Sequence, residues 1–174
     1  MSEFKKTVLM LDKTFDQKSK RHYLNGRLVV LHCHHYSSLY SQLAIDAGET
    51  ALLESVSRET FYTLIKDYLE DHNINVLTER IDIAVQYYAA VGLGKMNINY
   101  LGNDSGEVEL VNSHVDTGWI KKWGNYDKPV NYITAGYITG MFAAILNKPL
   151  NTFNALEVQS IVKGDAKSLF KVYK

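Results

Sequence analysis

The sequence has one cysteine, two prolines and a formal net charge of zero among its 174 residues. A single cysteine, Cys33, excludes an intrachain disulfide framework and any metal site built from several cysteines of one chain. Nineteen basic residues balance nineteen acidic ones, so no overall field favours nucleic acid or an anionic membrane surface. We therefore expect neither nucleic acid nor a membrane among the partners of this chain.

Long hydrophobic runs are also missing. No stretch approaches the roughly 20 apolar residues that a membrane helix needs, and the longest apolar run, 133–146, is interrupted by glycine and threonine. The first residues, MSEFKKTVLMLDKTF, lack the apolar centre and the cleavage-like tail of a signal peptide. These absences predict a cytoplasmic protein. A chain of this length suits one domain, so we expect residues 1–174 to form one.

Tyrosine, in contrast, is abundant, with 12 residues against six phenylalanines and two tryptophans. A tyrosine offers a large apolar ring and a hydroxyl that needs a partner, which suits a pocket lined by aromatic side chains. Half-buried positions of a sheet also favour tyrosine. The composition leaves both interpretations open.

The residue pattern changes from helical to extended near residue 95. An N-terminal segment, 1–26, is polar and ends in an Asn-Gly turn signal. In residues 27–94 a short β-rich run precedes apolar residues at helical spacing, which predicts three helices. In residues 95–174 two pairs of strand-like segments, each joined by a turn, predict two β-hairpins with helices between them. Helices followed by hairpins indicate an α+β fold with an antiparallel sheet.

Particular residues suggest the helix boundaries. We expect Ser37 or Ser38 to begin the first helix and Gly48 to end it, and Ser57 to cap the second. Pro129 is expected to open a long final helix, whose small residues would let a neighbouring helix approach closely.

The second half carries a set of spaced motifs. They read Pro129-Val-Asn-Tyr-Ile-Thr-Ala-Gly-Tyr-Ile-Thr-Gly140, then Glu157-x-x-Ser160, then Gly164-Asp165-x-x-Ser168-x-Phe170. This frame resembles the C-terminal half of 4-vinyl reductase domains, where it reads approximately P-V-C, A/T-G-Y-x-x-G, E-x-x-C and G-x-x-x-C-x-F. The resemblance covers about residues 95–174, and the N-terminal helices agree with it in their order.

The resemblance implies an antiparallel sheet of two hairpins packed against a helical layer, with a hydrophobic pocket between helices and sheet. Relatives of this hydrocarbon-binding family include phenol-type sensor modules of transcription activators and proteins linked to chlorophyll-precursor reduction. More distantly, the fold is similar to that of haem-based nitric oxide sensors and vesicle-tethering subunits. Because these relatives differ in what they bind, the fold alone does not identify the ligand. Family members commonly pair, so the resemblance also implies a homodimer.

The sequence departs from the family at its metal site. Many of these domains hold zinc with three cysteines and one glutamate. Matched position by position, the glutamate falls on Glu157 and the cysteines fall on Asn131, Ser160 and Ser168. Neutral serine and asparagine side chains are poor zinc ligands compared with thiolate. We therefore expect hydrogen bonds among these four side chains to replace the zinc, with a partner near the buried Glu157.

The first half contains a run that is rich in possible metal ligands and hydrogen-bonding side chains, HCHHY at residues 32–36. Whether the run is a strand or a helix, at least two of its imidazoles share a face. Two histidines and a carboxylate suffice for a mononuclear iron or zinc site, and His114, near Asp116, would supply a third ligand if the fold brings it close. The predicted metal ligands are His32, His34, His35 and His114.

A site without metal explains the same residues. Neutral histidines would hydrogen-bond the hydroxyl of an apolar ligand, or they would serve only as structural groups satisfied by backbone carbonyls. Two tyrosines complete the predicted ligand-binding set, which is His32, His34, His35, Tyr36, Tyr88, His114 and Tyr137.

Three functions are compatible with these patterns. The leading prediction is a cytoplasmic protein that binds a small hydrophobic or aromatic molecule in a pocket lined by tyrosine and histidine. The alternative is a metal-dependent enzyme, with iron or zinc at the histidine run, that acts on a small hydrophobic substrate. A structural tethering subunit would instead have an exposed apolar patch and a closed interior. No catalytic residue is predicted.

Overall fold

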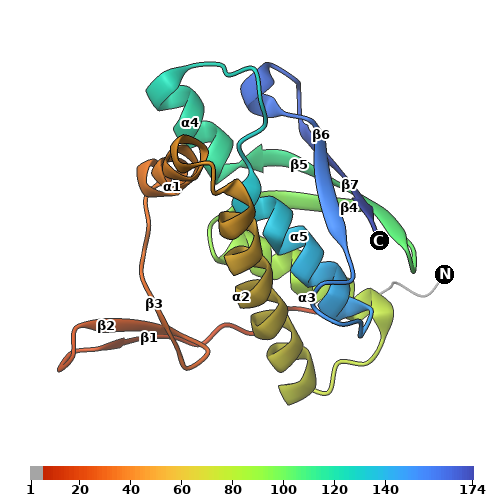
Figure 1. Cartoon of the computed structure of the whole chain (residues 1–174). Coiled ribbons are helices and arrows are strands. Elements are labelled where there is room, and N and C mark those ends of the chain that lie inside the picture. The colour runs from red at the N-terminus through yellow and green to blue at the C-terminus, as the bar shows by residue number, and fades with distance from the viewer. Residues whose placement is uncertain (1–5) are drawn as a thin grey trace.

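The computed structural model describes residues 6–174. Residues 1–5 lie outside this range. They belong to the predicted N-terminal segment and to the sequence that was compared with a signal peptide. The elements follow one another in the order shown in Figure 1. They are β1 (Lys13–Asp16), β2 (Arg21–Leu24), β3 (Arg27–Val29), α1 (His34–Ala47), α2 (Thr50–Asp71), α3 (Leu77–Ala90), β4 (Gly94–Leu101), β5 (Ser105–Ser113), α4 (His114–Trp123), α5 (Tyr132–Ile145), β6 (Asn154–Gln159), a 3₁₀ turn (Ile161–Lys163) and β7 (Ser168–Tyr173).

Four strands form the antiparallel sheet predicted for the second half, in the order β4-β5-β7-β6. β4 and β5 make the first hairpin, β6 and β7 make the second, and β7 pairs with β5 to join the two. Met96, Val108 and Phe170 are buried on the side that belongs to the core. The predicted fold class, an α+β fold with two hairpins against a helical layer, is confirmed.

Helix α5 lies at the centre of the core, and every residue from Thr134 to Ile145 is buried. A helix that is apolar all round is stable only when it is enclosed in this way. Helix α2 packs closely along it because a Cβ atom at Gly136 or Gly140 would collide with backbone carbonyl oxygens of α2. The small residues of α5 therefore permit the close helix contact that the sequence predicts.

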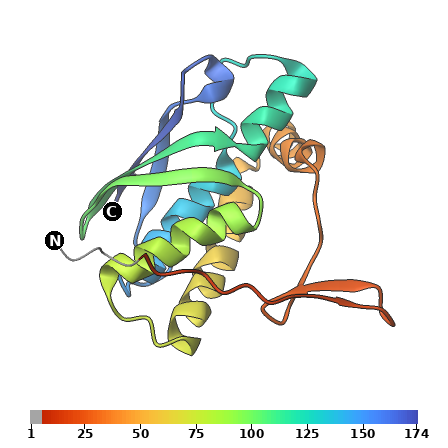
Figure 2. The same cartoon turned by 180° about the vertical axis from the view of Figure 1, so that it is seen from behind.

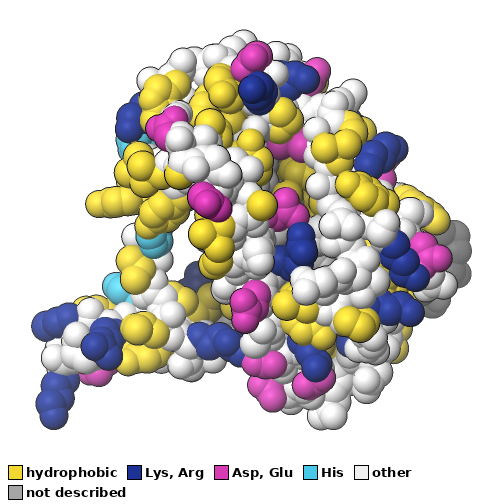
Figure 3. Space-filling view, in the orientation of Figure 1, with side chains coloured by type: hydrophobic (Ala, Val, Ile, Leu, Met, Phe, Trp, Pro, Cys, Tyr) yellow, Lys and Arg dark blue, Asp and Glu magenta, His cyan; other side chains and the backbone are white. Residues whose placement is uncertain are grey.

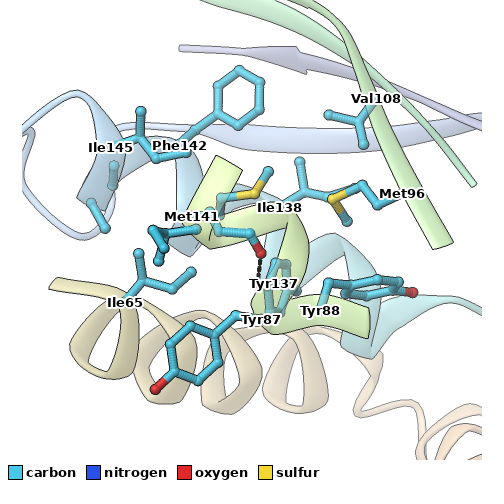
Figure 4. Close-up of a cluster of buried hydrophobic side chains, with 14 of the residues drawn as sticks. Ile65, Tyr87, Tyr88, Met96, Val108, Tyr137, Ile138, Met141, Phe142 and Ile145 are labelled. Atoms are coloured by element: carbon cyan, nitrogen blue, oxygen red, sulfur yellow. Dashed lines mark hydrogen bonds between the residues drawn. The ribbon is translucent and has the colours of Figure 1, made fainter. Parts of the chain in front are cut away.

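Adjacent tyrosines of α3 complete this core. Figure 4 shows Tyr87 and Tyr88 pointing in different directions from α3, as neighbours on a helix must. The ring of Tyr88 packs edge-on against Tyr137, with the ring centres 4.9 Å apart. Four of the twelve tyrosines, Tyr68, Tyr87, Tyr88 and Tyr137, are therefore part of the core.

The first helix begins earlier than predicted. Helix α1 includes His34 and the two residues after it, so the HCHHY run is the entry to a helix and not a strand. The end of the helix agrees with the prediction, since Gly48 follows it in the left-handed conformation with φ 72°.

Two other helix starts also differ from the prediction. Helix α2 begins at Thr50, and the hydroxyl of Ser57 donates instead to the backbone carbonyl of Ile133 (2.6 Å). Ser57 therefore links α2 to α5 through a hydrogen bond. A serine hydroxyl can donate to a carbonyl of another helix as well as cap the end of its own helix. Helix α5 begins at Tyr132, three residues beyond Pro129.

Residues 13–29 form a sheet of which the sequence patterns predicted only β3, in the β-rich run that begins at Arg27. Strands β1, β2 and β3 pair antiparallel in that order. Together with the linker at residues 30–33 they form an arm, residues 13–33, that projects from the body of the molecule (Figures 1 and 2). All four residues of β1 are exposed, so alternation of apolar and polar residues, the usual sign of a strand, has no buried face to produce it here.

The arm is attached to the body at the predicted Asn-Gly turn. Asn25 and Gly26 both have positive φ angles, 48° and 73°, as a tight hairpin turn requires. The Asn25 side chain donates to the hydroxyl of Tyr87 (3.0 Å), and Arg27 forms an ion pair with Asp67 of α2. Within residues 6–174, no helix combines the length and the apolar character needed to cross a membrane.

Candidate functional site

A cavity of about 420 Å³ lies where the arm meets the body. This volume falls in the range of small-molecule sites, roughly 300–1,000 Å³. Figure 3 shows the molecule hollowed between the arm and the body on this side. We call it the arm-side cavity, and its apolar wall includes Val30, Leu31, Tyr40, Phe61, Leu93 and Ile133.

Three polar side chains also line the arm-side cavity: His32 of the linker, Ser37 of α1 and His114 of α4. The fold therefore brings two of the predicted histidines, 82 positions apart in the sequence, to one cavity. The Nδ1 atom of His32 lies 3.5 Å from the hydroxyl of Tyr40, and its ring packs against Tyr36 with the ring centres 5.8 Å apart.

His34 lies between the other histidines at the start of α1. Its ring centre is 4.1 Å from that of His35 and 5.9 Å from that of His114. Burial lowers the pKa of His34, and repulsion from His35, Lys121 and His114 lowers it further. A helix start also disfavours positive charge. The imidazole of His34 is therefore kept neutral near pH 7.

The imidazoles of His34, His35 and His114 are neighbours. In the part of the chain that the structure describes, no three His, Cys, Asp or Glu side chains come together in a way that could hold a metal ion. Cys33 is exposed, with its sulfur 3.9 Å from Nδ1 of His35. The predicted iron or zinc at the histidine run has no geometric support here.

The other predicted ligand-binding residues lie outside the arm-side cavity. Tyr36 and His35 are exposed on α1. Tyr88 and Tyr137 are fully buried; the hydroxyl of Tyr88 pairs with that of Thr134 (2.9 Å), and Tyr137 donates to a backbone carbonyl of α3 (2.5 Å). Burial raises the pKa of both phenols, so these hydroxyls stay protonated and serve the core.

Ten of the twelve residues that line the cavity were absent from the predicted set, among them Tyr40, Phe61, Leu93 and Ile133. Tyr40 lies one helical turn after Tyr36, and it would have been found had the helix been started at His34. Phe61, Leu93 and Ile133 come from three other parts of the chain, and only the tertiary fold brings them together.

A second polar cluster lies at the positions matched to the zinc ligands of the resembled family. The Nδ2 atom of Asn131 lies 2.8 and 2.9 Å from the two carboxylate oxygens of Asp116 and 2.9 Å from Oε1 of Glu157. One amide group thus donates to two acidic side chains. Glu157 has the partner expected for it, whereas Asp116 was not predicted. We call Asp116, Asn131, Glu157 and the serines around them the carboxyl cluster.

Two serines complete the hydrogen bonding of the carboxyl cluster. Ser113 donates to Oδ1 of Asn131 (3.0 Å) and accepts from the backbone N–H of Asp116 (3.1 Å), which makes it the cap of α4. Ser168 donates to Asp116 (3.3 Å). The expected network among the four matched positions is therefore present in part, and Asp116 is at its centre.

Ser160 stands apart from that network. Its hydroxyl is buried and makes no hydrogen bond with any residue of the described chain. It nevertheless lies close enough to Glu157 to help lower the pKa of that carboxyl. A buried hydroxyl without a well-formed hydrogen bond is costly, so this edge of the cluster has an unused polar group.

Burial in the carboxyl cluster favours the protonated form of its two acids. Burial raises the pKa of Glu157 to about 7, and the nearby Asp116 contributes to the rise. Burial also raises the pKa of Asp116, although hydrogen bonds from Asn131, Ser113 and Ser168 oppose the shift. Glu157 is therefore the group of the pair that binds a proton near neutral pH.

The carboxyl cluster does not fit a zinc ion. Zinc prefers thiolate, imidazole and carboxylate ligands, and three of the four matched positions carry neutral side chains. The space between the two carboxyl groups is taken by the side-chain NH2 group of Asn131, which donates to both. A hydrogen-bond donor thus occupies the place where a zinc site requires a cation.

No family model matches this chain, and no curated protein matches it either. Solved structures do resemble it. The phenol-responsive sensory domain of the transcription activator PoxR, crystallised with phenol, is 13% identical with a TM-score of 0.77, and the match covers 92% of this chain and 84% of that one.

Two further structures are more distant. A vinyl-4-reductase family protein from Methanocaldococcus jannaschii is 20% identical with a TM-score of 0.54, covering 79% of this chain and 78% of that one. A trafficking protein particle complex subunit 3 from Naegleria fowleri, covalently bound to palmitic acid, is 16% identical with a TM-score of 0.52, covering 79% and 89%. At these identities the likeness shows the fold, and the resemblance to 4-vinyl reductase domains holds at that level.

Proposed function

We propose that this chain is a small-molecule-binding protein that holds a small, uncharged aromatic or hydrophobic molecule in the arm-side cavity. The observation that carries the proposal is the cavity itself, in which an apolar wall meets three polar side chains, His32, Ser37 and His114. Sites for small molecules combine these two features, since the apolar wall supplies affinity and a few polar groups set the orientation.

The polar groups suit a ligand with one hydroxyl. An imidazole can donate from one ring nitrogen and accept at the other, and a serine hydroxyl can do both. The nearby Tyr40 and Phe61 offer aromatic faces and edges for an aromatic ring. The structural likeness to a phenol-responsive sensory domain supports the same ligand class.

Titration of the purified protein with phenol, followed by calorimetry and by NMR shifts of the histidine rings, tests this proposal. We expect saturable binding with shifts for His32 and His114 and none for His72, which lies at the far end of α2. Native mass spectrometry of the untreated protein would show any molecule that co-purifies. Absence of both a co-purified molecule and saturable binding would favour a closed tethering subunit.

We also propose that two copies pair through the arm. Leu28, Val30 and Leu31 are 57%, 73% and 79% exposed, and a three-stranded sheet with so little cover is marginal in water. Exposed apolar residues gathered on one element commonly mark a protein interface. Light scattering should give twice the mass of the chain, and Leu31→Asp should return the monomer.

The metal-dependent enzyme remains a prediction, and analysis of the purified protein for iron, zinc and copper tests it. A content below about one-tenth equivalent after purification without chelators would exclude it. A cytoplasmic location likewise remains a prediction, which fractionation of the source cells would test.

A further inference from the structure

A second apolar cavity, of about 300 Å³, adjoins the arm-side cavity. It lies under the strands of the arm, and we call it the strand cavity. Its apolar wall includes Phe15, Tyr23, Leu24 and Val29. None of these four residues lines the arm-side cavity, so the aromatic site proposed above does not account for them.

One face of the arm sheet points toward the strand cavity. Phe15, His22 and Val29 are cross-strand neighbours in β1, β2 and β3. Leu24 lies two residues beyond His22, on the same face of the sheet, and all four side chains line the cavity. Phe15 is nevertheless 41% exposed. An apolar face that is left partly in water gains free energy when an apolar molecule covers it.

The strand cavity and the arm-side cavity share part of their walls. Four residues line both cavities: Val30 and Leu31 of the linker, and Ala90 and Val91 at the end of α3. The two cavities therefore meet where the linker passes the end of α3. All four shared side chains are apolar, so this junction suits a hydrocarbon chain better than a polar group, which would lose its hydration there.

We propose that the molecule bound in the arm-side cavity is a phenol with a linear alkyl chain, and that this chain passes between the linker and the end of α3 into the strand cavity. The inference rests on the proposed function, because the ring and the hydroxyl occupy the aromatic site. The hydroxyl meets His32, Ser37 and His114 there. The chain contacts first the shared side chains and then the apolar face of the arm sheet.

The length of the chain sets the affinity of such a ligand. Each methylene group that leaves water contributes about 0.8 kcal/mol, or about fourfold in affinity. A phenol without a chain obtains none of this gain. The strand cavity thus distinguishes alkylphenols from phenol itself, whereas the polar groups of the arm-side cavity treat the two alike.

Calorimetric titration of the full chain with phenol and with 4-butylphenol tests this proposal. The two probes have the same ring and hydroxyl and differ by four carbon atoms. We expect 4-butylphenol to bind at least about fifteenfold more tightly, which corresponds to burial of half of its chain. Equal affinities would overturn this inference, while saturable binding of phenol would still support the proposed function. If neither probe binds, both proposals fail.

A variant of the arm determines where the chain lies. Phe15→Asp places a charge in the wall of the strand cavity and outside the arm-side cavity. It should reduce the preference for 4-butylphenol to less than about threefold and leave the affinity for phenol unchanged. Val111→Asp is the matched control, because Val111 is a half-exposed apolar residue of β5 that lines neither cavity. Its preference should equal that of the unmodified protein.

NMR on the unmodified protein gives a second measurement, which holds even if Phe15→Asp disturbs the arm. The methyl signals of Leu24 and Val29, which line only the strand cavity, should shift with 4-butylphenol and not with phenol. A preference for 4-butylphenol that persists in Phe15→Asp, or methyl signals that respond equally to both probes, would show that the chain lies elsewhere and would refute the inference.

Discussion

The arm-side cavity and the carboxyl cluster are built from the same two helix starts, yet they are chemically opposite. His114 lines the cavity and Asp116, two residues later on α4, belongs to the cluster. Ile133 lines the cavity and Asn131, two residues earlier, holds the cluster together. Side chains two residues apart on a helix point in different directions. The starts of α4 and α5 therefore contribute side chains both to the arm-side cavity and to the carboxyl cluster.

The two regions differ in how strongly their contribution to folding stability depends on charge. The arm-side cavity is open and contains imidazoles beside apolar rings, so losing one polar side chain there leaves the rest hydrated. The carboxyl cluster is largely buried and contains two acids that form no ion pair in the described chain, so a change of charge there acts on folding itself. Substitutions in the cluster should alter stability first, and substitutions in the cavity should alter binding first.

The largest expected effect comes from adding charge to the cluster. Asn131→Asp replaces the one donor that reaches both Asp116 and Glu157 by a third acid. We expect the free energy of unfolding to fall by about 3–5 kcal/mol near neutral pH, as when a buried charge loses its partner. Urea titration followed by circular dichroism measures it.

Asn75→Asp is the matched control, because Asn75 is exposed in the loop before α3 and bonds only to a neighbouring carbonyl. It should change the free energy of unfolding by less than about 0.5 kcal/mol. The loss in Asn131→Asp should shrink as the pH is lowered and the acids become protonated. A loss that is the same at every pH would show that packing, and not charge, holds this region.

The next effect is the pH dependence of the unmodified protein. The pKa of Glu157 is raised from 4.5 to about 7 in the fold, so folding favours the protonated form. Its contribution to stability is complete below the unfolded pKa and is lost as the pH rises through about 7, to a total of at most about 3 kcal/mol. Chemical unfolding between about pH 5 and pH 8 measures this loss.

Glu157→Gln isolates the contribution of that one group. An uncharged amide of the same shape keeps an acceptor for Asn131 and cannot ionise. The fall in stability between about pH 5 and pH 8 should therefore be much smaller in the variant than in the unmodified protein. Parallel pH profiles for the two proteins would assign the dependence to another group.

A smaller effect is expected in the arm-side cavity. His114→Ala removes a polar group from the wall and should weaken phenol binding by about tenfold, or about 1.4 kcal/mol. The melting temperature should change little, because the His114 ring is only partly buried. Thermal unfolding and calorimetry on the same samples separate the two effects. Equal losses of stability and of phenol affinity would contradict the expectation that substitutions in the cavity affect binding more than folding.

The sequence predicted much of the second half of the fold and of the carboxyl cluster. Alternation in β4 and β5, the turn residues and the spaced motifs identified the sheet because each is a local signal. Asn131 and Glu157 were placed together by the resemblance alone. Asp116 was not, since a single aspartate at the start of a helix looks like an ordinary charge near the helix dipole.

The arm and the cavity wall were harder to predict for a physical reason. Strand β1 is exposed throughout and β2 has one buried residue, Leu24, so no apolar alternation marks these two strands. Phe61, Leu93 and Ile133 meet only after α2, α3 and α5 have packed. Within the HCHHY run, the sequence identified histidines but could not show which of them face the cavity, since that depends on where α1 begins.

The smallest expected effect concerns His35, which shares the chemistry of His114 but not its place. Its side chain is exposed on the first turn of α1 and does not line the arm-side cavity. His35→Ala should therefore change the affinity for phenol by less than about twofold, within the range of surface substitutions. Calorimetry beside His114→Ala makes the comparison direct. A loss as large as that of His114→Ala would mean that His35 turns into the cavity when a ligand or a second copy is bound, and the three neighbouring imidazoles would then act as one site.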